Sequence, residues 1–349
     1  MNTKYEISDW EELINNSSMP QKAKNNKLSL VRKAYENEVP VILDLDHLAH
    51  LLGLKVGVLT SMVKSPISFY RQFKIPKKRG GFRDIVTPYE SLLEVQQWIV
   101  EHILSKFQVH NAAYAYVKKR NVAQNSTIHI GCDQMLKIDL KDFFPSVKIP
   151  RVRELFNRVG YSKEVSYFLT NLCCLNGSIP QGAASSPMIS NIILLTLDKR
   201  LSTFSANNNI KYSRYADDLV FSGNFKFSDF KTLVVMSVED EGFKVNSDKT
   251  REYLEGHRKM VTGIVVGKEN IRLPKAKRRE IRKEVFFIMK YGILDQVKRY
   301  NDIYYADRVL GRLSYWKQIE PENEFVLTSL KAINKLYKSI LEQDIKSKK

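Results

Sequence analysis

The stretch Tyr215-Ala216-Asp217-Asp218 constrains the fold most, because two adjacent carboxylates must share one short turn. Residues 210–214 before it and 219–223 after it are rich in β-branched and aromatic side chains, which predicts a strand on each side. Like charges this close repel unless a cation binds between them, and oxygen ligands suit a hard divalent ion such as Mg²⁺. A turn that uses Asp only for local hydrogen bonds is the alternative.

A third carboxylate lies on another predicted strand. In residues 135–140, apolar side chains alternate with Lys137 and Asp139, so Asp139 belongs to the polar face of this strand. An Asp on one strand and two more on a distant hairpin provide carboxylate ligands for two metal ions. Such a pair of ions can clamp the attacking and leaving oxygens of phosphoryl transfer. We therefore predict that Asp139 joins Asp217 and Asp218 as catalytic ligands of two Mg²⁺ ions.

Three segments together resemble the palm motifs of reverse transcriptases. Residues 138–146 (IDLKDFFPS) are similar to the first motif, residues 179–187 (IPQGAASSP) to the second, and residues 215–222 (YADDLVFS) to the third. The resemblance implies an α+β fold of the right-hand polymerase type, with fingers, palm and a helical thumb. It also implies RNA-directed DNA synthesis from dNTPs.

Residues 69–86 predict a β-hairpin whose tip, 77–81, is basic and contains two glycines. A mobile basic hairpin suits the binding of a triphosphate, because charged donors can close on its oxygens. A merely solvated tip is the alternative. The similarity to the fingers hairpin of reverse transcriptases implies that Arg83, with Lys77 or Lys78, contacts the incoming nucleotide.

The same resemblance implies further nucleotide contacts. Phe144 matches the aromatic residue beneath the sugar, where a ring would clash with a ribose 2′-OH and so select dNTPs; a core position is the alternative, and we expect it for Phe143. Gln181 can donate and accept hydrogen bonds at the base or sugar, and Gly182 leaves room for the nucleotide. Lys249 matches a Lys near the leaving pyrophosphate, as a general acid or a neutralising charge, unless it is a solvated turn residue.

Two other segments resemble signatures of bacterial retron reverse transcriptases. Asn125 to His129 (NSTIH) is similar to Asn-Ala-x-x-His, with Ser126 where Ala is usual, and Val261-Thr262-Gly263 matches Val-Thr-Gly. Without the family, Asn125 and His129 would be ordinary polar loop residues. Both segments are expected to contact RNA.

What is known of retron enzymes gives the wider expectations. They copy part of their own structured noncoding RNA into single-stranded DNA joined to RNA (msDNA), starting from the 2′-OH of an internal guanosine. The resemblance implies this reaction here, with a role in anti-phage defence. The implied partners are the structured RNA, its RNA–DNA product, dNTPs and an effector protein encoded nearby.

The C-terminal residues 272–349 are strongly basic. They contain 19 Lys and Arg against 10 Asp and Glu, and so supply +9 of the formal net charge of +18. A solvated charged face, the alternative, would mix the signs more evenly. A cation-rich helix beside a palm therefore predicts a grip on nucleic acid, through Arg278, Arg279 and Arg282.

The expected division of the chain follows these segments. It consists of an N-terminal helical extension (1–70), fingers (71–138), a palm (139–271, with 150–185 contributing to the fingers) and a helical basic thumb (272–349).

Cysteine usage and hydropathy bear on the compartment. The three cysteines have no metal-ligand spacing, which favours a reduced, cytoplasmic protein. No apolar run is long enough to span a membrane and the first residues are not a signal peptide, so no membrane is expected.

Two alternative functions stay open. Another bacterial reverse transcriptase, of the group II intron or abortive-infection type, would share the palm motifs; the lack of a maturase or nuclease segment after residue 349 argues against the intron type. A non-catalytic RNA-binding scaffold with a decayed palm is a different class, and the presence of all three carboxylates argues against it.

Overall fold

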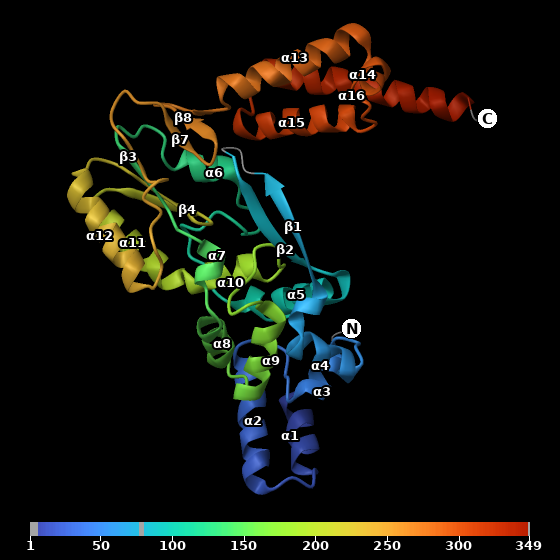
Figure 1. The fold of residues 1–349 in the computed structure, drawn as a ribbon, viewed down its shortest axis with the longest axis vertical. Helices are drawn as coiled ribbons and strands as arrows, with labels where there is room; N and C mark the ends of the chain where they lie inside the picture. Colours follow the sequence, from blue (N-terminus) through green and yellow to red (C-terminus); the bar gives the residue numbers. More distant parts are fainter. Residues whose placement is uncertain (1–5, 77–79, 348–349) are drawn as a thin grey trace.

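The computed structural model describes residues 6–76 and 80–347, with side chains up to residue 340. Helices of the N-terminal part lie at one end of an elongated molecule and helices of the C-terminal part at the other, with the main sheet between them (Figure 1). Within residues 6–347, except 77–79, no helix is both long and apolar enough to cross a membrane.

A four-stranded sheet with the order β4-β5-β3-β6, here called the palm sheet, forms the centre. Its neighbouring strands are antiparallel, and β4 and β5 are joined by the hairpin that the sequence predicts. The strands are β3 (Met135–Asp139), β4 (Lys211–Tyr215), β5 (Asp218–Ser222) and β6 (Arg251–Tyr253).

The two faces of the palm sheet bury different cores, as period-2 alternation requires. Leu136 and Ile138 belong to the larger hydrophobic cluster, which also contains residues of the helices around the sheet. Met135 and Val220 belong to a second cluster, shared with the C-terminal helices. Because Asp139 alternates with Ile138, its side chain lies on the same face as Met135.

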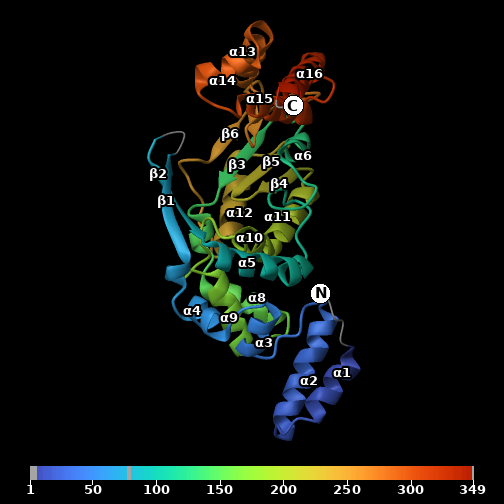
Figure 2. The same ribbon diagram turned by 90° about the vertical axis from the view of Figure 1, so that its right-hand side faces the viewer.

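Helices surround the palm sheet and join it to the N-terminal part of the chain (Figures 1 and 2). Those of the N-terminal part are α1 (Ile7–Asn15), α2 (Gln21–Glu36), α3 (Leu45–Leu51), α4 (Val56–Lys64) and the 3₁₀ turn η1 (Pro66–Phe69). Those of the middle part are α5 (Glu90–His102), η2 (Leu104–Lys106), α7 (Phe143–Ser146), α8 (Ile149–Arg158), α9 (Lys163–Cys173), α10 (Ser186–Ile193), α11 (Leu195–Asn207) and α12 (Phe227–Asp240).

The predicted fingers hairpin is present as β1 (Tyr70–Pro76) and β2 (Phe82–Pro88), paired in register from Tyr70–Pro88 to Pro76–Phe82. It stands beside the palm sheet and rises toward the C-terminal helices (Figure 2). Of the nucleotide contacts expected from this hairpin, Arg83 lies on β2, and Lys77 and Lys78 lie outside the described residues.

A small antiparallel sheet links the palm sheet to the C-terminal helices. It contains β7 (Lys259–Val261), β8 (Ile264–Val266) and β9 (Ile271–Arg272), and the short helix α6 (Val122–Thr127) packs on it. The turn of β7 and β8 holds Thr262 and Gly263, both at positive φ. Thr262 and Gly263 thus form the tight turn of a β-hairpin.

The C-terminal residues form the helical layer expected of a thumb, which overhangs the rest of the molecule (Figure 1). Its helices are α13 (Lys275–Tyr291), α14 (Ile293–Tyr300), α15 (Tyr305–Ile319) and α16 (Glu324–Ser347). Its core is built on Trp316, which is fully buried, and on Ile281, Val285 and Ile288 of α13, which are also buried, whereas Met289 on the same helix is exposed. The proposed domain boundaries stay a prediction.

Candidate active site and nucleic-acid interface

The turn between β4 and β5 holds the two adjacent carboxylates. Tyr215 pairs with Asp218, which leaves Ala216 and Asp217 as a two-residue turn. Ala216 has φ 57°, a left-handed conformation that favours glycine. The Asp217 carbonyl accepts a hydrogen bond of 2.9 Å from the amide of Leu140, so the turn is tied to the end of β3.

The register of the palm sheet brings the third carboxylate to the same edge. Asp139, the last residue of β3, is directly opposite Asp218 on β5. Directly opposite residues of an antiparallel pair present their side chains on one face, about 5 Å apart. The three carboxylates that the sequence predicts as one site therefore lie together.

Two residues from the loop after α12 hold Asp139. The Lys249 ammonium donates to both carboxylate oxygens of Asp139, at 2.8 and 3.1 Å. The Asn246 side chain donates to one of them at 3.1 Å, and its amide donates to the Asp139 carbonyl at 2.8 Å. The sequence identifies Lys249 only through the resemblance and does not identify Asn246 at all.

Burial and mutual repulsion dominate the electrostatics of the sheet edge that carries Asp139, Asp217 and Asp218, here called the acidic edge. Burial, followed by the negative charges of Asp139 and Asp218, raises the pKa of Asp217 from 3.8 to about 6. Burial also raises the pKa of Asp218, which Lys137 opposes from 3.7 Å away. The hydrogen bond to Asp139 raises the pKa of Lys249, so this side chain stays protonated.

These residues fit a divalent cation. The three aspartates offer only carboxylate oxygens as ligands. A bound cation would relieve the repulsion between these carboxylates. In the part of the chain that the structure describes, no three acidic, His or Cys side chains already converge tightly enough to enclose an ion. Lys249, which holds both oxygens of Asp139, therefore has to move aside for these oxygens to serve as ligands.

The raised pKa of Asp217 predicts a pH dependence of stability in metal-free protein. The folded state binds this proton more tightly than the unfolded state. Protonation of Asp217 therefore stabilises the folded state fully below about pH 4, and this stabilisation is lost as the pH rises through about 6. Asp217→Asn removes the cost of holding a charged carboxylate at this partly buried position. We expect it to be more stable than the wild type near pH 7 in EDTA, by roughly 1–3 kcal/mol, and by less near pH 4.

Chemical denaturation across this pH range measures the difference. Asp133→Asn, at an exposed position just before β3, is the matched control and should show no such trend. A difference between wild type and Asp217→Asn that stays flat with pH would contradict the raised pKa of Asp217 in the folded protein.

Phe144 lies on the short helix α7, which begins four residues after the end of β3. Its ring is half-buried and lies 5.2 Å from that of Phe143, which is buried in the core as expected. The Tyr116 ring is also near that of Phe144, with 6.4 Å between the ring centroids. Burial and then the charge of Asp217 raise the pKa of the Tyr116 hydroxyl, while Arg83 opposes this. Tyr116 thus lies among the candidate nucleotide contacts, and no spacing in the sequence marks it.

The loop with Gln181 and Gly182 is attached to the fingers hairpin. The Val86 amide donates to the Gln181 carbonyl at 3.0 Å, and the Thr87 hydroxyl donates to the Gly182 carbonyl at 3.2 Å. A Cβ on Gly182, which has φ 129°, would lie 2.7 Å from the Val86 carbonyl oxygen. Gly182 is therefore required by the close approach of the β2 backbone, a reason that the sequence does not reveal.

The two segments expected to contact RNA meet each other. The Ser126 hydroxyl on α6 donates to the Val261 carbonyl at 3.1 Å and lies 3.4 Å from the Thr262 hydroxyl. Gly263 at the turn is exposed and Thr262 is half-buried. Asn125 is fully buried, and neither polar atom of its side chain has a hydrogen-bond partner.

Direct RNA contact by Asn125, His129 and Val261 does not agree with their burial. The two ring nitrogens of His129 lie 2.7 Å from the hydroxyls of Ser222 and Ser213, so His129 bridges β5 and β4. Burial lowers its pKa to about 3, which keeps the ring neutral. Of the five residues in these segments that were expected to contact RNA, Thr262 and Gly263 are therefore the two that a ligand can reach, while His129 joins two strands of the sheet.

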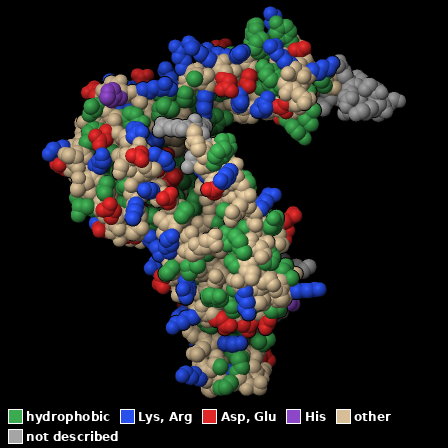
Figure 3. All heavy atoms as spheres, in the orientation of Figure 1, with side chains coloured by type: hydrophobic (Ala, Val, Ile, Leu, Met, Phe, Trp, Pro, Cys, Tyr) green, Lys and Arg blue, Asp and Glu red, His purple; other side chains and the backbone are tan. Residues whose placement is uncertain are grey.

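Lysines and arginines gather over the first turns of α13, and the molecule is hollowed below the thumb (Figure 3). Arg279 and Arg282 are exposed and Arg278 is half-buried. The Arg282 guanidinium also stacks on aromatic rings of the thumb core, 5.7 Å from Trp316 and 5.1 Å from Phe325. Arg282 therefore contributes packing as well as charge.

Comparison with known proteins agrees with this geometry. Residues 75–284, more than half of the chain, match the family described as reverse transcriptase (RNA-dependent DNA polymerase). The retron Ec86 reverse transcriptase of Escherichia coli is 32% identical over 257 residues, which cover 72% of this chain and 79% of that protein.

Two further relatives give the same result. The retron Mx65 reverse transcriptase of Myxococcus xanthus is 32% identical, with 81% of this chain and 70% of that protein covered. The retron Ec73 reverse transcriptase of Escherichia coli is 31% identical, with 76% and 87% covered. The chain belongs to the bacterial retron reverse transcriptases, and is thus an RNA-directed DNA polymerase with an α+β, right-hand fold of fingers, palm and thumb.

Proposed function

We propose that this enzyme copies part of one structured noncoding RNA into single-stranded DNA that stays joined to the RNA, starting from the 2′-OH of an internal guanosine. The observation that carries the proposal is the junction of the NSTIH and VTG segments, because it leaves the turn at Thr262 and Gly263 accessible to a ligand on a polymerase fold. The similarity to several retron enzymes supports it. A role in anti-phage defence, with an effector protein, is part of the same proposal.

In the proposed reaction, the carboxylates of Asp139, Asp217 and Asp218 would hold two Mg²⁺ ions. When bound, these ions would supply positive charge to offset the negative charge that develops as the primer hydroxyl attacks the α-phosphorus and pyrophosphate leaves. Lys249 is protonated beside Asp139 and can give its proton to the departing pyrophosphate, or offset its charge.

The nucleotide is proposed to lie between the palm sheet and the fingers hairpin. Arg83 on β2 supplies positive charge toward the triphosphate, and Gln181 and Gly182 form the floor on which the base and sugar rest. The Phe144 ring excludes a ribose 2′-OH. Tyr116, in contact with Phe144, completes this wall.

A priming assay tests the proposal. Purified protein is incubated with dNTPs, Mg²⁺ and RNA transcribed from the DNA next to its gene. We expect DNA that remains attached to RNA under denaturing conditions and becomes shorter after RNase digestion. An RNA with a 2′-deoxy substitution at the mapped branch guanosine is the control and should yield none. DNA made only from an added primer would contradict self-priming and leave reverse transcription intact.

RNA affinity and RNA specificity should depend on different residues. Neutralising Arg278, Arg279 and Arg282 should weaken the binding of every RNA and lower the salt dependence, by about one unit of slope for each lost phosphate contact. Altering Thr262 should mainly reduce the preference for the cognate RNA, because shape and 2′-hydroxyls are read at specific positions.

The measurement is a titration of cognate and scrambled RNAs at several salt concentrations. Neutralising three exposed lysines of the N-terminal helices (Lys22, Lys55 and Lys64) is the matched control for net charge and should change the slope little. Equal binding of both RNAs by the wild type at raised salt would contradict recognition of one folded RNA.

A further inference from the structure

Arg214, on β4 two residues before the Ala216–Asp217 turn, is a fully buried arginine. Its guanidinium makes three hydrogen bonds of 2.6 to 3.1 Å to the carboxylate of Asp198 on α11, which is also fully buried. Tyr212 donates to the same carboxylate at 2.7 Å. A buried ion pair of this kind often contributes little net stability compared with apolar side chains of similar size. Stability alone is therefore a weak reason for its presence.

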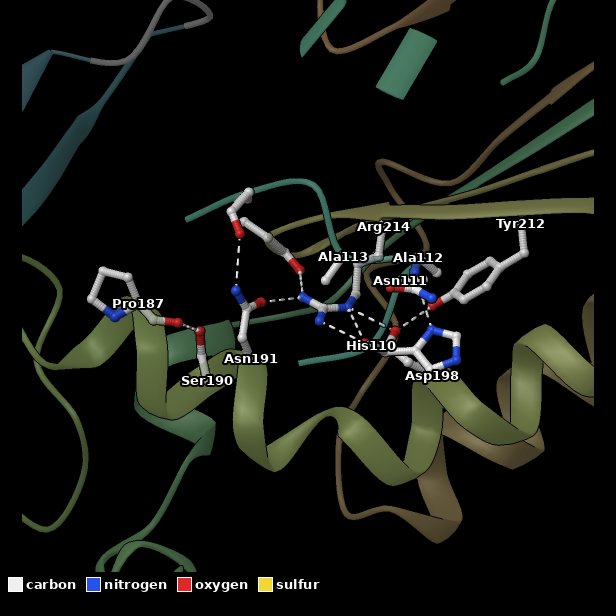
Figure 4. Close-up of polar contacts among 12 residues, drawn as sticks. His110, Asn111, Ala112, Ala113, Pro187, Ser190, Asn191, Asp198, Tyr212 and Arg214 are labelled. Carbon is white, nitrogen blue, oxygen red and sulfur yellow. Dashed lines mark hydrogen bonds and ion pairs between the residues drawn. The ribbon is translucent and has the colours of Figure 1, made fainter. Parts of the chain in front are cut away.

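The remaining bonds of Arg214 point toward the active site. Its Nη1 donates to the Ala216 carbonyl and to the Asn191 side chain, each at 3.0 Å, and Figure 4 shows the guanidinium between Asn191 and Asp198. Asn191 in turn donates to the Ala115 carbonyl at 2.9 Å, next to Tyr116.

The hydrogen bond to Ala216 acts on the most strained part of the hairpin. Ala216 is buried and has a positive φ of 57°, which alanine adopts only when its surroundings impose it. Arg214 holds the carbonyl of this residue, and the Leu140 amide holds the carbonyl of Asp217. Both carbonyls of the turn are thus fixed, one from each side, and the direction of the following carboxylates depends on them.

We propose that Arg214 is a positioning residue, which with Asp198 holds the Ala216–Asp217 turn so that the carboxylates of Asp217 and Asp218 face Asp139. This inference rests on the proposed role of those carboxylates in holding the cations. Arginine suits the task because its planar fork can bond Asp198, Asn191 and Ala216 at once. A lysine ammonium keeps the charge but cannot reproduce these directions.

The test is Arg214→Lys in the full chain, with two readouts besides activity. Direct Mn²⁺ binding, followed by electron paramagnetic resonance without nucleotide, should weaken about three- to tenfold, and amides of the turn should exchange hydrogen faster. DNA synthesis should fall by roughly 10- to 100-fold in kcat, with the Kd for template RNA unchanged.

Two control variants separate positioning from general stability. Arg200→Lys makes the same exchange in an exposed ion pair with Asp240 on the neighbouring helices, and should change none of the readouts. Leu201→Ala opens a cavity in the buried face of α11 and should lower the melting temperature without weakening Mn²⁺ binding.

Should Arg214→Lys not fold, a variant with an apolar replacement of the whole cluster decides the question. Arg214→Met with Asp198→Leu and Tyr212→Phe removes the buried charges together, so the fold is retained while the bond to Ala216 is lost. It should show the same weaker Mn²⁺ binding and faster turn exchange.

The outcomes separate this inference from the proposed function. Wild-type values for Mn²⁺ binding and turn exchange in a folded variant would overturn the positioning role. If Asp217→Asn leaves Mn²⁺ binding unchanged, the proposed cation site fails instead, and turn exchange alone then decides on Arg214.

Discussion

Asp217→Asn is expected to abolish dNTP incorporation, by roughly 10³-fold or more, while leaving RNA affinity nearly unchanged. The substitution keeps the size of the side chain and removes one charge from an edge where three carboxylates lie together. Cation binding and stabilisation of the developing phosphate charge both weaken. The basic surface of α13, in contrast, lies on the overhanging thumb and is not altered (Figure 3).

Incorporation and RNA binding should be measured on the same preparation. Asp133→Asn, which removes an equal charge at an exposed site near the other end of β3, should behave as the wild type. Retained incorporation by Asp217→Asn would remove Asp217 from the catalytic residues. If RNA binding also persisted, a non-catalytic RNA-binding role for this palm would gain support.

Phe144→Ala is expected to admit ribonucleotides, raising their incorporation relative to dNTPs by about 10- to 100-fold. The half-buried ring lies near both Phe143 in the core and the exposed Tyr116, and in the proposed arrangement its removal opens space beside the sugar of the nucleotide. Only the substrate with a 2′-OH gains from that space. The preference for dNTPs should therefore fall without loss of dNTP incorporation.

The measurement compares a dNTP with the matching rNTP in both proteins. Phe225→Ala is the control, since it removes another half-buried ring, near the opposite end of the palm sheet. An unchanged ratio in Phe144→Ala would show that Phe144 is a packing residue and that sugar selection occurs elsewhere.

Alternation and turn chemistry made the hairpins predictable from the sequence. Residues 210–223 read as strand, turn and strand, and the structure has β4, the two-residue turn and β5 there. The strand 135–139 was predictable because the alternation of apolar and polar residues is a local pattern, although the structure buries side chains on both of its faces. The helix before it, α6, was not, since its six residues are too few to show helical periodicity.

Contacts between distant segments could not be read from local patterns. Asn246 and Lys137 hold the acidic edge through the register of the sheet and a loop that returns more than a hundred residues later. Likewise, the polar character of His129 suggested a surface position. Two serines on neighbouring strands satisfy its ring nitrogens, so burial carries no hydrogen-bond penalty.

The location of bound Mn²⁺ in a complex with primer, template and an unreactive dNTP analogue tests the acidic edge most directly, by anomalous scattering. We predict ions within about 2.1–2.2 Å of carboxylate oxygens of Asp139, Asp217 and Asp218, with the Lys249 ammonium moved away from Asp139. Ions bound elsewhere, with Lys249 still holding both oxygens of Asp139, would contradict the assignment of these three residues as the catalytic metal ligands.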